Sequence, residues 1–287
     1  MVFIRSQFTF RDSPAGAVLR AARLNAIMHG IHPEVGLPAD EAKNEPWRVQ
    51  RYETIDSTMT AARALPAWSA VVADEQTAGR GQAQRRFVSD FGGVYLTAVL
   101  PYGGDPLAMR GFALAVGWAV REELGKLGVR GLRLKWPNDL MIGRAKVGGI
   151  LIEQGTHVTV LVGIGLNVRN HPWRNAPELA GIAGTLSEAA EGERSALPVK
   201  DEIVRALLRG IERAHLEFGR RGLAGMVNQL NDCWAGARIV EVSLVNGRPA
   251  VRGVFLGIDE GGALHLLVKP GTSVVIPAHH VDRLREI

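Results

Sequence analysis

The sequence has few of the features that mark several large classes of proteins. A single cysteine, Cys233, excludes an internal disulfide framework and agrees with a reducing compartment such as the cytoplasm. The longest apolar run, Gly111 to Val120, is far shorter than the roughly 20 residues that span a bilayer, so we expect no membrane span. The eight histidines are scattered, and the adjacent pair His279 and His280 would point to opposite faces of a strand, which makes a poor chelate.

Lysine is scarce as well, because only six of the 34 basic residues are lysine and the rest are arginine. The net charge of +5 and the pI near 9.7 would suit an anionic partner. The charge is spread along the chain rather than gathered in a block, which makes DNA an unlikely partner. With 46% hydrophobic and 22% charged residues, the 287-residue chain is typical of a globular protein with one large and one small domain.

The most informative part of the chain lies between Leu134 and Asn167. Two apolar, β-branched segments at 146–154 and 158–168 have the length of strands and lie a short turn apart, which predicts an antiparallel pair. Polar side chains that a hydrophobic core would not select interrupt this region, and several glycines favour a ligand or another backbone that approaches closely. The polar residues are Lys135, Asn138, Asp139, Lys146 and Asn167, and the glycines are Gly148, Gly149, Gly163 and Gly165.

Two earlier segments also carry groups suited to anions. Asp56-Ser57-Thr58 follows an expected strand and predicts the start of a helix through Leu65, whose free N–H groups and hydroxyls can receive a carboxylate. An ordinary helix N-cap is the alternative interpretation. The loop at 76–93 lacks the Gly-Lys-Ser/Thr ending of a P-loop, but Gly79-Arg80-Gly81 can bring N–H groups and a guanidinium to one anion.

The remaining segments predict a large unit followed by a small one. Asn246-Gly247 between two alternating segments is a strong hairpin signal, and successive short strands without a long helix predict a small barrel. We therefore divide the chain into an N-terminal extension of unknown role at 1–45, a unit at 46–235 and a C-terminal unit at 236–287. The expected helices are 107–127, 200–218 and 223–234, and the expected strands are 47–55, 69–74, 93–101, 132–136, 238–244, 251–258 and 263–268.

Five motifs, taken in their order and spacing, resemble those of the biotin protein ligases, and the resemblance covers roughly residues 48–287. It implies an α+β fold, with a mixed sheet packed with helices as in the class II synthetase-like biotin/lipoate ligase catalytic domain, plus a C-terminal SH3-like β-barrel. It also implies an enzyme that makes biotinyl-5′-adenylate from biotin and MgATP and passes the biotinyl group to a lysine of a carboxylase's biotin carboxyl carrier domain. The motifs are Asp-Ser-Thr at 56–58, Gln-Thr-Ala-Gly-Arg-Gly at 76–81, Leu-Lys-Trp-Pro-Asn-Asp-Leu at 134–140, Lys-Val-Gly-Gly-Ile-Leu-Ile-Glu at 146–153 and Val-Gly-Ile-Gly-Leu-Asn at 162–167.

Joining a carboxylate to ATP brings two anions together, so catalysis is mainly positioning and charge neutralisation. We expect Lys146 to be the catalytic cation, with Arg80 supporting the same charge. Asp139 would meet phosphate through Mg²⁺, which takes oxygen ligands. The residues expected to bind biotin are Ser57, Thr58, Gln76, Gly79, Arg80, Lys146, Gly149, Gly163 and Gly165. Those expected to bind ATP are Arg80, Arg85, Phe87, Lys135, Asn138, Asp139 and Asn167.

The loop departs from the family pattern at three positions. Gln82 stands where the family has a second arginine, Gln84 where a glycine is usual, and Phe87 where a tryptophan is usual. Because the loss of an arginine removes a charge-assisted contact to the α-phosphate, we predict weaker retention of the adenylate.

Three other functions remain open at this stage: a lipoate–protein ligase with the same adenylation chemistry, a regulatory protein that holds biotin and binds DNA, and a degenerate ligase. Residues 1–45 look too short for a winged helix-turn-helix module. A helix at 17–28 within a packed or mobile extension is favoured there, and a targeting peptide is the alternative. A homodimer is considered alongside the monomer.

Overall fold

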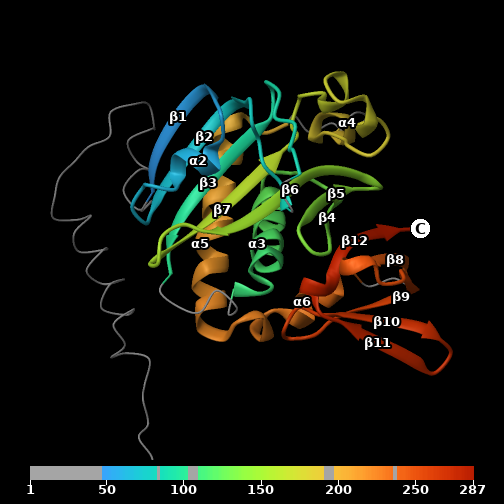
Figure 1. The fold of residues 1–287 in the computed structure, drawn as a ribbon. Coiled ribbons are helices and arrows are strands. Elements are labelled where there is room, and N and C mark those ends of the chain that lie inside the picture. The colour runs from blue at the N-terminus through green and yellow to red at the C-terminus, as the bar shows by residue number, and fades with distance from the viewer. Residues whose placement is uncertain (1–46, 83–84, 103–108, 191–196, 235–237) are drawn as a thin grey trace, which may run out of the picture.

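The computed structural model describes residues 47–82, 85–102, 109–190, 197–234 and 238–287 (Figure 1). The predicted N-terminal extension and its helix at 17–28 lie outside the described residues, as does Gln84 in the altered loop. Among the described residues, no helix is long and apolar enough to cross a membrane.

The larger unit is built on a seven-stranded mixed sheet in the order β1-β2-β3-β7-β6-β5-β4. β1 pairs in parallel with β2, and all other neighbours in this sheet are antiparallel. The predicted pair of central strands is confirmed as β6 and β7, which are apolar enough to lie at the centre of the sheet. The strands are β1 (Arg48–Ile55), β2 (Ser69–Gln76), β3 (Val94–Pro101), β4 (Leu132–Lys135), β5 (Asp139–Ile142), β6 (Ala145–Gln154) and β7 (Thr159–Leu166).

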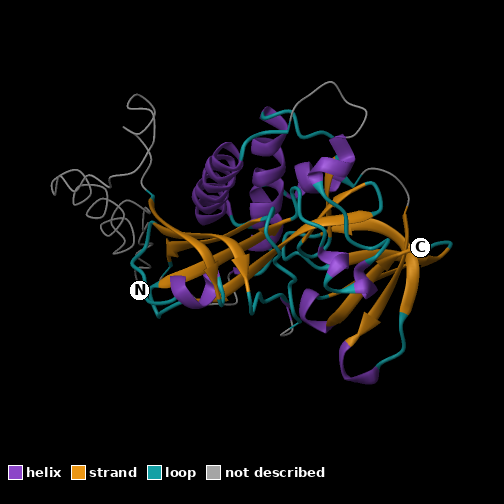
Figure 2. Ribbon diagram, turned by 90° about the horizontal axis from the view of Figure 1, so that it is seen from above, coloured by secondary structure: helices purple, strands orange, loops and turns teal. Residues whose placement is uncertain are grey.

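The two faces of this sheet have different covers. The long helices α3 (Phe112–Lys126) and α5 (Lys200–Arg221) pack on one face, where they bury the main hydrophobic core (Figure 2). The short helix α2 (Thr58–Ala62) packs on the other face through a separate cluster around Met59 and Leu161. The second face is therefore only partly covered, which leaves room for a site.

Four helices differ from their predicted bounds. α5 continues three residues beyond its expected end at 218, to Arg221. The helix expected from residue 107 begins at Phe112, after Gly111 adopts a left-handed backbone with φ +80°. α2 ends at Ala62, three residues before Leu65, where the following Pro66 disfavours helical backbone. The helix expected at 223–234 is a 3₁₀ turn followed by α6 (Val227–Cys233). The 3₁₀ turns are η5 (Pro172–Arg174), η6 (Pro177–Leu179), η7 (Leu223–Gly225), η8 (Val245–Gly247) and η9 (Ala278–His280), and α4 is Leu186–Ala190.

The C-terminal unit is a five-stranded antiparallel sheet in the order β11-β10-β9-β8-β12. It agrees with the predicted SH3-like unit, although no pairing between its edge strands β11 and β12 occurs among the described residues. β8 and β9 pair as predicted, but η8 and three further residues connect them instead of a two-residue turn. The strands are β8 (Arg238–Leu244), β9 (Val251–Ile258), β10 (Leu264–Lys269), β11 (Thr272–Ile276) and β12 (Val281–Glu286).

One indole group and a guanidinium join the two units. The Nε1 of Trp136 donates to the carbonyl oxygen of Gly262 in the C-terminal unit at 3.2 Å. The Nε1 of Trp234 donates to the carbonyl oxygen of Leu134 at 2.9 Å within the larger unit. The guanidinium of Arg133 makes two hydrogen bonds to the Glu286 carboxylate, at 2.7 and 2.9 Å. Arg133 lies in β4 and Glu286 in β12, so the central motif is fastened to the C-terminal sheet.

A half-buried histidine of α5 packs against aromatic side chains next to the sheet and on α3. The ring of His215 lies 5.9 Å from that of Trp68 and 6.4 Å from that of Phe112. Burial lowers the pKa of His215 from 6.5 to about 4. Below about pH 6.5 the imidazole of His215 therefore binds a proton in the unfolded chain but not in the folded chain. The unfolding free energy consequently falls as the pH falls toward 4.

We predict that this histidine makes the protein sensitive to acid. Between pH 7 and pH 4.5 the wild type should lose about 2 kcal/mol more unfolding free energy than the His215→Phe variant, which retains the aromatic packing. Urea unfolding at the two pH values measures this difference. The His157→Gln variant, at an exposed turn, is the control and should follow the wild type. Equal acid sensitivity of the wild type and His215→Phe would contradict the prediction.

Candidate active site

A row of paired residues crosses the partly covered face of the large sheet. Lys135 pairs with Asp139, Asp139 with Gly149, and Gly149 with Gly165, on the adjacent strands β4, β5, β6 and β7. Gly165 in turn pairs with Tyr95 on β3. Because directly paired residues point to the same face, the topology brings a cation, an anion and two glycines from the predicted site side by side.

A β-bulge in β6 adds Lys146 to this row. One extra residue, Val147, lies between the partners of Leu140 and Met141 on β5. In a regular strand, residues an odd number of positions apart point to opposite faces, as Lys146 and Gly149 would. The bulge reverses this alternation, so Lys146 shares a face with Gly149. The local fold therefore turns the predicted catalytic cation toward the site.

The ammonium of Lys146 is paired inside the row. Its Nζ lies 2.5 Å from the Oδ1 of Asp139, and both side chains are partly buried. A Cβ added to Gly149 would lie 3.5 Å from the same Nζ, so the lysine side chain folds back over this glycine. Lys146 and Asp139 form one neutral pair on the sheet, from which either group can turn to a phosphate or to a metal ion carried by phosphate.

The glycines of β7 are required for close approach, as the sequence predicts, and side chains make that approach in this structure. A Cβ on Gly165 would lie 2.5 Å from the ring of Phe87, and one on Gly163 would lie 2.8 Å from the Sδ of Met59. Phe87 belongs to the Arg-rich loop and Met59 to α2. These two segments therefore rest directly on the floor of the site.

Polar groups gather at the beginning of α2. The Oε1 of Gln76 accepts hydrogen bonds from the N–H of Thr58 at 2.8 Å and from its hydroxyl at 3.0 Å. The hydroxyl of Thr97 donates to the Thr58 Oγ1 at 2.8 Å, and the amide of Gln76 donates to the Ser89 Oγ at 2.9 Å. Ser57 is buried, and its Oγ has no hydrogen-bond partner. This hydroxyl is available to a ligand.

The Arg-rich loop forms a hairpin over the same face, which we call the arginine hairpin and define as residues 76–82 and 85–89. The N–H of Phe87 donates to the carbonyl oxygen of Gly79 at 2.9 Å, and the N–H of Gly81 donates to that of Arg85 at 2.7 Å. A Cβ on Gly79 would overlap the carbonyl oxygen of Phe87, so the hairpin requires glycine there. The described residues of the predicted nucleotide-binding segment thus form a hairpin in this structure.

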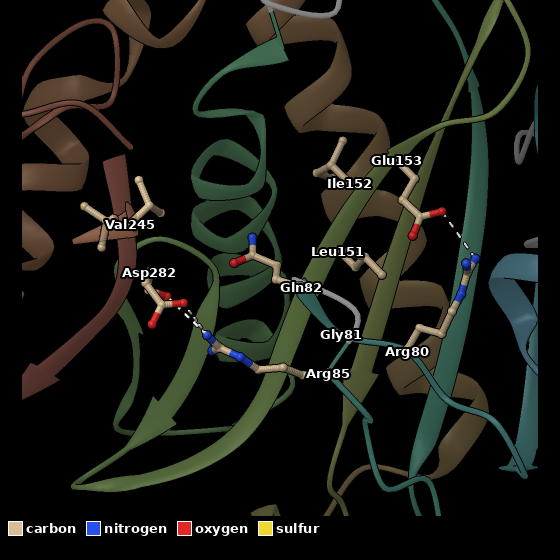
Figure 3. A pocket seen from close by; sticks show the side chains of 10 residues that line it. Arg80, Gly81, Gln82, Arg85, Leu151, Ile152, Glu153, Val245 and Asp282 are labelled. Carbon is tan, nitrogen blue, oxygen red and sulfur yellow. Dashed lines mark hydrogen bonds and ion pairs between the residues drawn. The ribbon is translucent and has the colours of Figure 1, made fainter. Parts of the chain in front are cut away.

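Two arginines of this hairpin, Arg80 and Arg85, are paired with carboxylates other than that of Asp139, the partner of Lys146. The guanidinium of Arg80 lies 3.3 Å from the carboxylate of Glu153, seven positions further along β6 than Lys146. Arg85 lies 3.0 Å from the carboxylate of Asp282 on β12. Together with Gln82, these residues line a cleft of about 880 Å³ between β6 and the C-terminal sheet (Figure 3).

Two other predicted residues hold the fold in this structure. The amide of Asn138 donates to the carbonyl oxygen of Ile150 at 2.7 Å. The amide of Asn167 donates to the carbonyl oxygen of Gly184 at 3.2 Å, and its Oδ1 accepts a hydrogen bond from Asn170 at 3.0 Å. Their roles toward ATP stay predictions.

The donor set suits a metal ion that arrives with its substrate. Within the described residues, no group of three or more His, Cys, Asp or Glu side chains is arranged to hold a metal. Asp139 supplies one carboxylate, and Mg²⁺ is commonly bound by one or two carboxylates together with nucleotide phosphates. The geometry therefore fits Mg²⁺ carried by ATP.

Sequence reasoning missed Glu153, Asp282 and Asp90. Glu153 could have been found only as the last residue of the Lys-Val-Gly-Gly-Ile-Leu-Ile-Glu motif. No sequence pattern indicates Asp282. Asp90 follows the hairpin and accepts a hydrogen bond from Asn175 at 2.9 Å through Oδ1, while its Oδ2 is buried without a partner. Beside it, burial raises the pKa of Tyr95, with the Asp90 charge as a further cause.

Comparison with known proteins defines the class to which this fold and site belong. Residues 50–168 match the biotin/lipoate A/B protein ligase family. The chain is 34% identical over 224 residues to the biotin–[acetyl-CoA-carboxylase] ligase of Paracoccus denitrificans, across 75% of this chain and 89% of that protein. The chain belongs to the biotin/lipoate A/B protein ligase family.

Within that family, its relatives include biotin protein ligases in both sequence and structure. The chain is 33% identical over 221 residues to the bifunctional ligase/repressor BirA of Escherichia coli, and the match covers 72% of this chain and 65% of that protein. A structure of the biotin protein ligase from Aquifex aeolicus in complex with biotin and ATP superposes with a TM-score of 0.71 at 25% identity, across 83% of this chain and 99% of that one. These findings confirm the predicted resemblance and fold class.

Proposed function

We propose that the chain is a biotin–protein ligase. It activates biotin with MgATP to biotinyl-5′-adenylate and transfers the biotinyl group to a lysine of a carboxylase's biotin carboxyl carrier domain. The observation that carries the proposal is the row from Lys135 to Gly165, with Lys146 turned onto it by the bulge. A glycine floor beside an ammonium is suited to hold a carboxylate against a triphosphate.

In the first step a carboxylate oxygen of biotin attacks the α-phosphorus of ATP, and pyrophosphate leaves. Lys146 neutralises the charge shared by the carboxylate and the α-phosphate, which lowers the repulsion between two anions. Lys135, one strand further out in the row, faces the leaving pyrophosphate. Mg²⁺, held by Asp139 and the phosphates, supplies further charge neutralisation when it is bound.

In the second step the neutral amine of the acceptor lysine attacks the acyl carbon of the mixed anhydride. An amide forms, AMP leaves with the bonding electron pair, and the amine loses a proton. The reaction requires positioning rather than a protein nucleophile. The row provides no serine, cysteine or histidine for a covalent intermediate on this chain, in agreement with direct transfer.

The remaining assignments are those that the sequence predicts. Ser57, through its unpartnered hydroxyl, and Thr58 receive the polar end of biotin beside Gln76. Arg80, Arg85 and Phe87 contact the nucleotide from the hairpin. The full proposed biotin site is Ser57, Thr58, Gln76, Gly79, Arg80, Lys146, Gly149, Gly163 and Gly165, and the proposed ATP site is Arg80, Arg85, Phe87, Lys135, Asn138, Asp139 and Asn167.

Exchange of labelled pyrophosphate into ATP tests the first step. We expect exchange that requires biotin and is not supported by lipoate, because the relatives from Paracoccus denitrificans and Aquifex aeolicus are biotin ligases. Transfer of biotin to a separately purified carrier domain tests the second step. Exchange that proceeds without biotin, or with lipoate alone, would contradict the proposal and favour the lipoate ligase.

A cytoplasmic location and a protein rather than a nucleic acid as partner belong to the same proposal. The single cysteine and the carrier domain of a carboxylase as substrate support a cytoplasmic enzyme. A salt-dependent complex with DNA in the absence of other partners would favour the regulatory alternative. Sedimentation with and without the adenylate distinguishes the homodimer from the monomer.

Retention of the adenylate provides a separate prediction. Gln82 is exposed on the cleft and offers no charge to the α-phosphate, so the adenylate should be released faster than from a Gln82→Arg variant. A charge-assisted hydrogen bond of about 1.5–3 kcal/mol corresponds to a lifetime of about ten- to a hundredfold longer in the variant. Single-turnover release of labelled adenylate into a chase measures it, and equal lifetimes would refute the prediction.

A further inference from the structure

Two of the three arginines of the arginine hairpin, Arg80 and Arg85, are held by carboxylates from different parts of the chain. Arg80 pairs with Glu153 on β6, and Glu153 also accepts a hydrogen bond from Arg63 at 2.5 Å. Arg85 pairs with Asp282 on β12 through a carboxylate oxygen at 3.0 Å and the main-chain oxygen at 3.3 Å. Figure 3 shows the two pairs on opposite sides of the cleft, one toward each wall.

This arrangement holds the hairpin down on the floor of the site. Phe87, on the returning side of the hairpin, lies against Gly165 at the centre of the row. The base of the hairpin is joined to the sheet by main-chain hydrogen bonds from Thr77 to Ile55 and from Ala78 to Asp56. Beyond that base, two ion pairs join described residues of the hairpin to β6 and to the C-terminal sheet.

Both pairs are weak enough to exchange. The side chains of Arg80, Arg85 and Asp282 are 40%, 47% and 53% exposed, and exposed ion pairs bias an equilibrium by about fivefold at most. A triphosphate offers a guanidinium more negative charge and bidentate oxygens, and so forms the stronger contact. The same arginine cannot hold a carboxylate and a phosphate with the same N–H groups.

We propose that Glu153 and Asp282 are positioning residues that compete with nucleotide phosphate for Arg80 and Arg85. They hold the arginine hairpin on the site floor until ATP takes the guanidinium groups, and their release frees the floor beneath Phe87. Asp282 gives the C-terminal sheet a direct part in this exchange. The inference rests on the proposed function only in assigning phosphate to these arginines.

The test uses the full chain with Glu153→Gln, Asp282→Asn and the double variant. Without ligand, the N–H groups of Gly81 and Phe87 should exchange with solvent deuterium faster in the variants than in the wild type. The KM for ATP should fall about two- to fivefold for each single variant, because a competitor is removed, while kcat stays within about twofold. Glu241→Gln is the matched control, because it breaks a 2.6 Å pair with Arg285 that lies outside the hairpin.

If the two carboxylates had a merely structural role, their removal would raise the KM for ATP instead of lowering it. A raised KM for ATP, or wild-type hydrogen exchange in the double variant, would overturn the proposal. Hydrogen exchange of the ligand-free hairpin does not depend on catalysis, so it tests the pairs even if biotin-dependent pyrophosphate exchange is absent. If the wild type showed no biotin-dependent pyrophosphate exchange, that result would count against the proposed function.

Discussion

Replacement of Lys146 with alanine should lower kcat for biotin-dependent pyrophosphate exchange by about 10²–10³-fold, because the reaction then lacks the ammonium that neutralises the carboxylate and the α-phosphate. The measurement is the initial rate of exchange at saturating ATP and biotin. Lys126→Ala is the matched control, since Lys126 is also paired with a glutamate, Glu123, at 2.5 Å, but lies on α3. That variant should retain the wild-type rate.

The ion pair with Asp139 requires a second variant. Removal of Lys146 leaves the Asp139 carboxylate without its 2.5 Å partner, and an unpaired anion on the row would itself repel phosphate. The combination of Lys146→Ala with Asp139→Asn separates the two effects. If Lys146 acts on the substrates, the double variant stays at least as slow as the single one. Recovery to the wild-type rate would show that the lysine merely neutralises the aspartate.

The adjacent glycines Gly148 and Gly149 should give opposite results when substituted. A Cβ on Gly148 would lie 2.7 Å from the carbonyl oxygen of Gly165, so Gly148→Ala should lower the unfolding free energy by about 1–3 kcal/mol. A Cβ on Gly149 meets Lys146 and Phe87 only at 3.5 Å and beyond. Gly149→Val should therefore fold normally and fill the site, with biotin affinity lowered about 100-fold.

Each of these variants is the control for the other. Urea unfolding measures stability, and calorimetric titration with biotin measures affinity. A Gly149→Val protein that binds biotin as the wild type does would remove the glycine floor from the proposed site. A stable Gly148→Ala protein would show that β6 and β7 separate more easily than their close contact indicates.

The sequence was sufficient for the parts of the fold that depend on local pattern. The apolar segments that became β6 and β7 were predicted, because their length and short connection determine an antiparallel pair. The late start of α3 at Phe112 depends on the left-handed conformation of Gly111, which composition does not reveal. Three of the five C-terminal strands, β8, β9 and β10, were also predicted, whereas β11 and β12 were not. Whether their sheet closes depends on pairing between distant edges.

The contacts of the site that depend on pairing between neighbouring strands could be predicted from the sequence. The contacts between residues far apart in the sequence could not. The motif residues Lys135, Asp139 and Gly149 meet because strands pair in register. The bulge at Val147 could not be foreseen, because an extra valine in an apolar run leaves the hydrophobic pattern intact. The partners of Arg80 and Arg85 lie 73 and 197 positions away, and nothing in a local window indicates them.

The indole contact of Trp136 has a consequence for the independence of the two units. Its buried N–H finds its acceptor, the carbonyl oxygen of Gly262, in the C-terminal unit, so separating the units would leave this donor unsatisfied at a cost of about 1–3 kcal/mol. Trp136 directly follows Lys135, so that loss would fall on the peptide segment that presents the row. The small C-terminal unit is consequently one half of a shared frame rather than an interchangeable module.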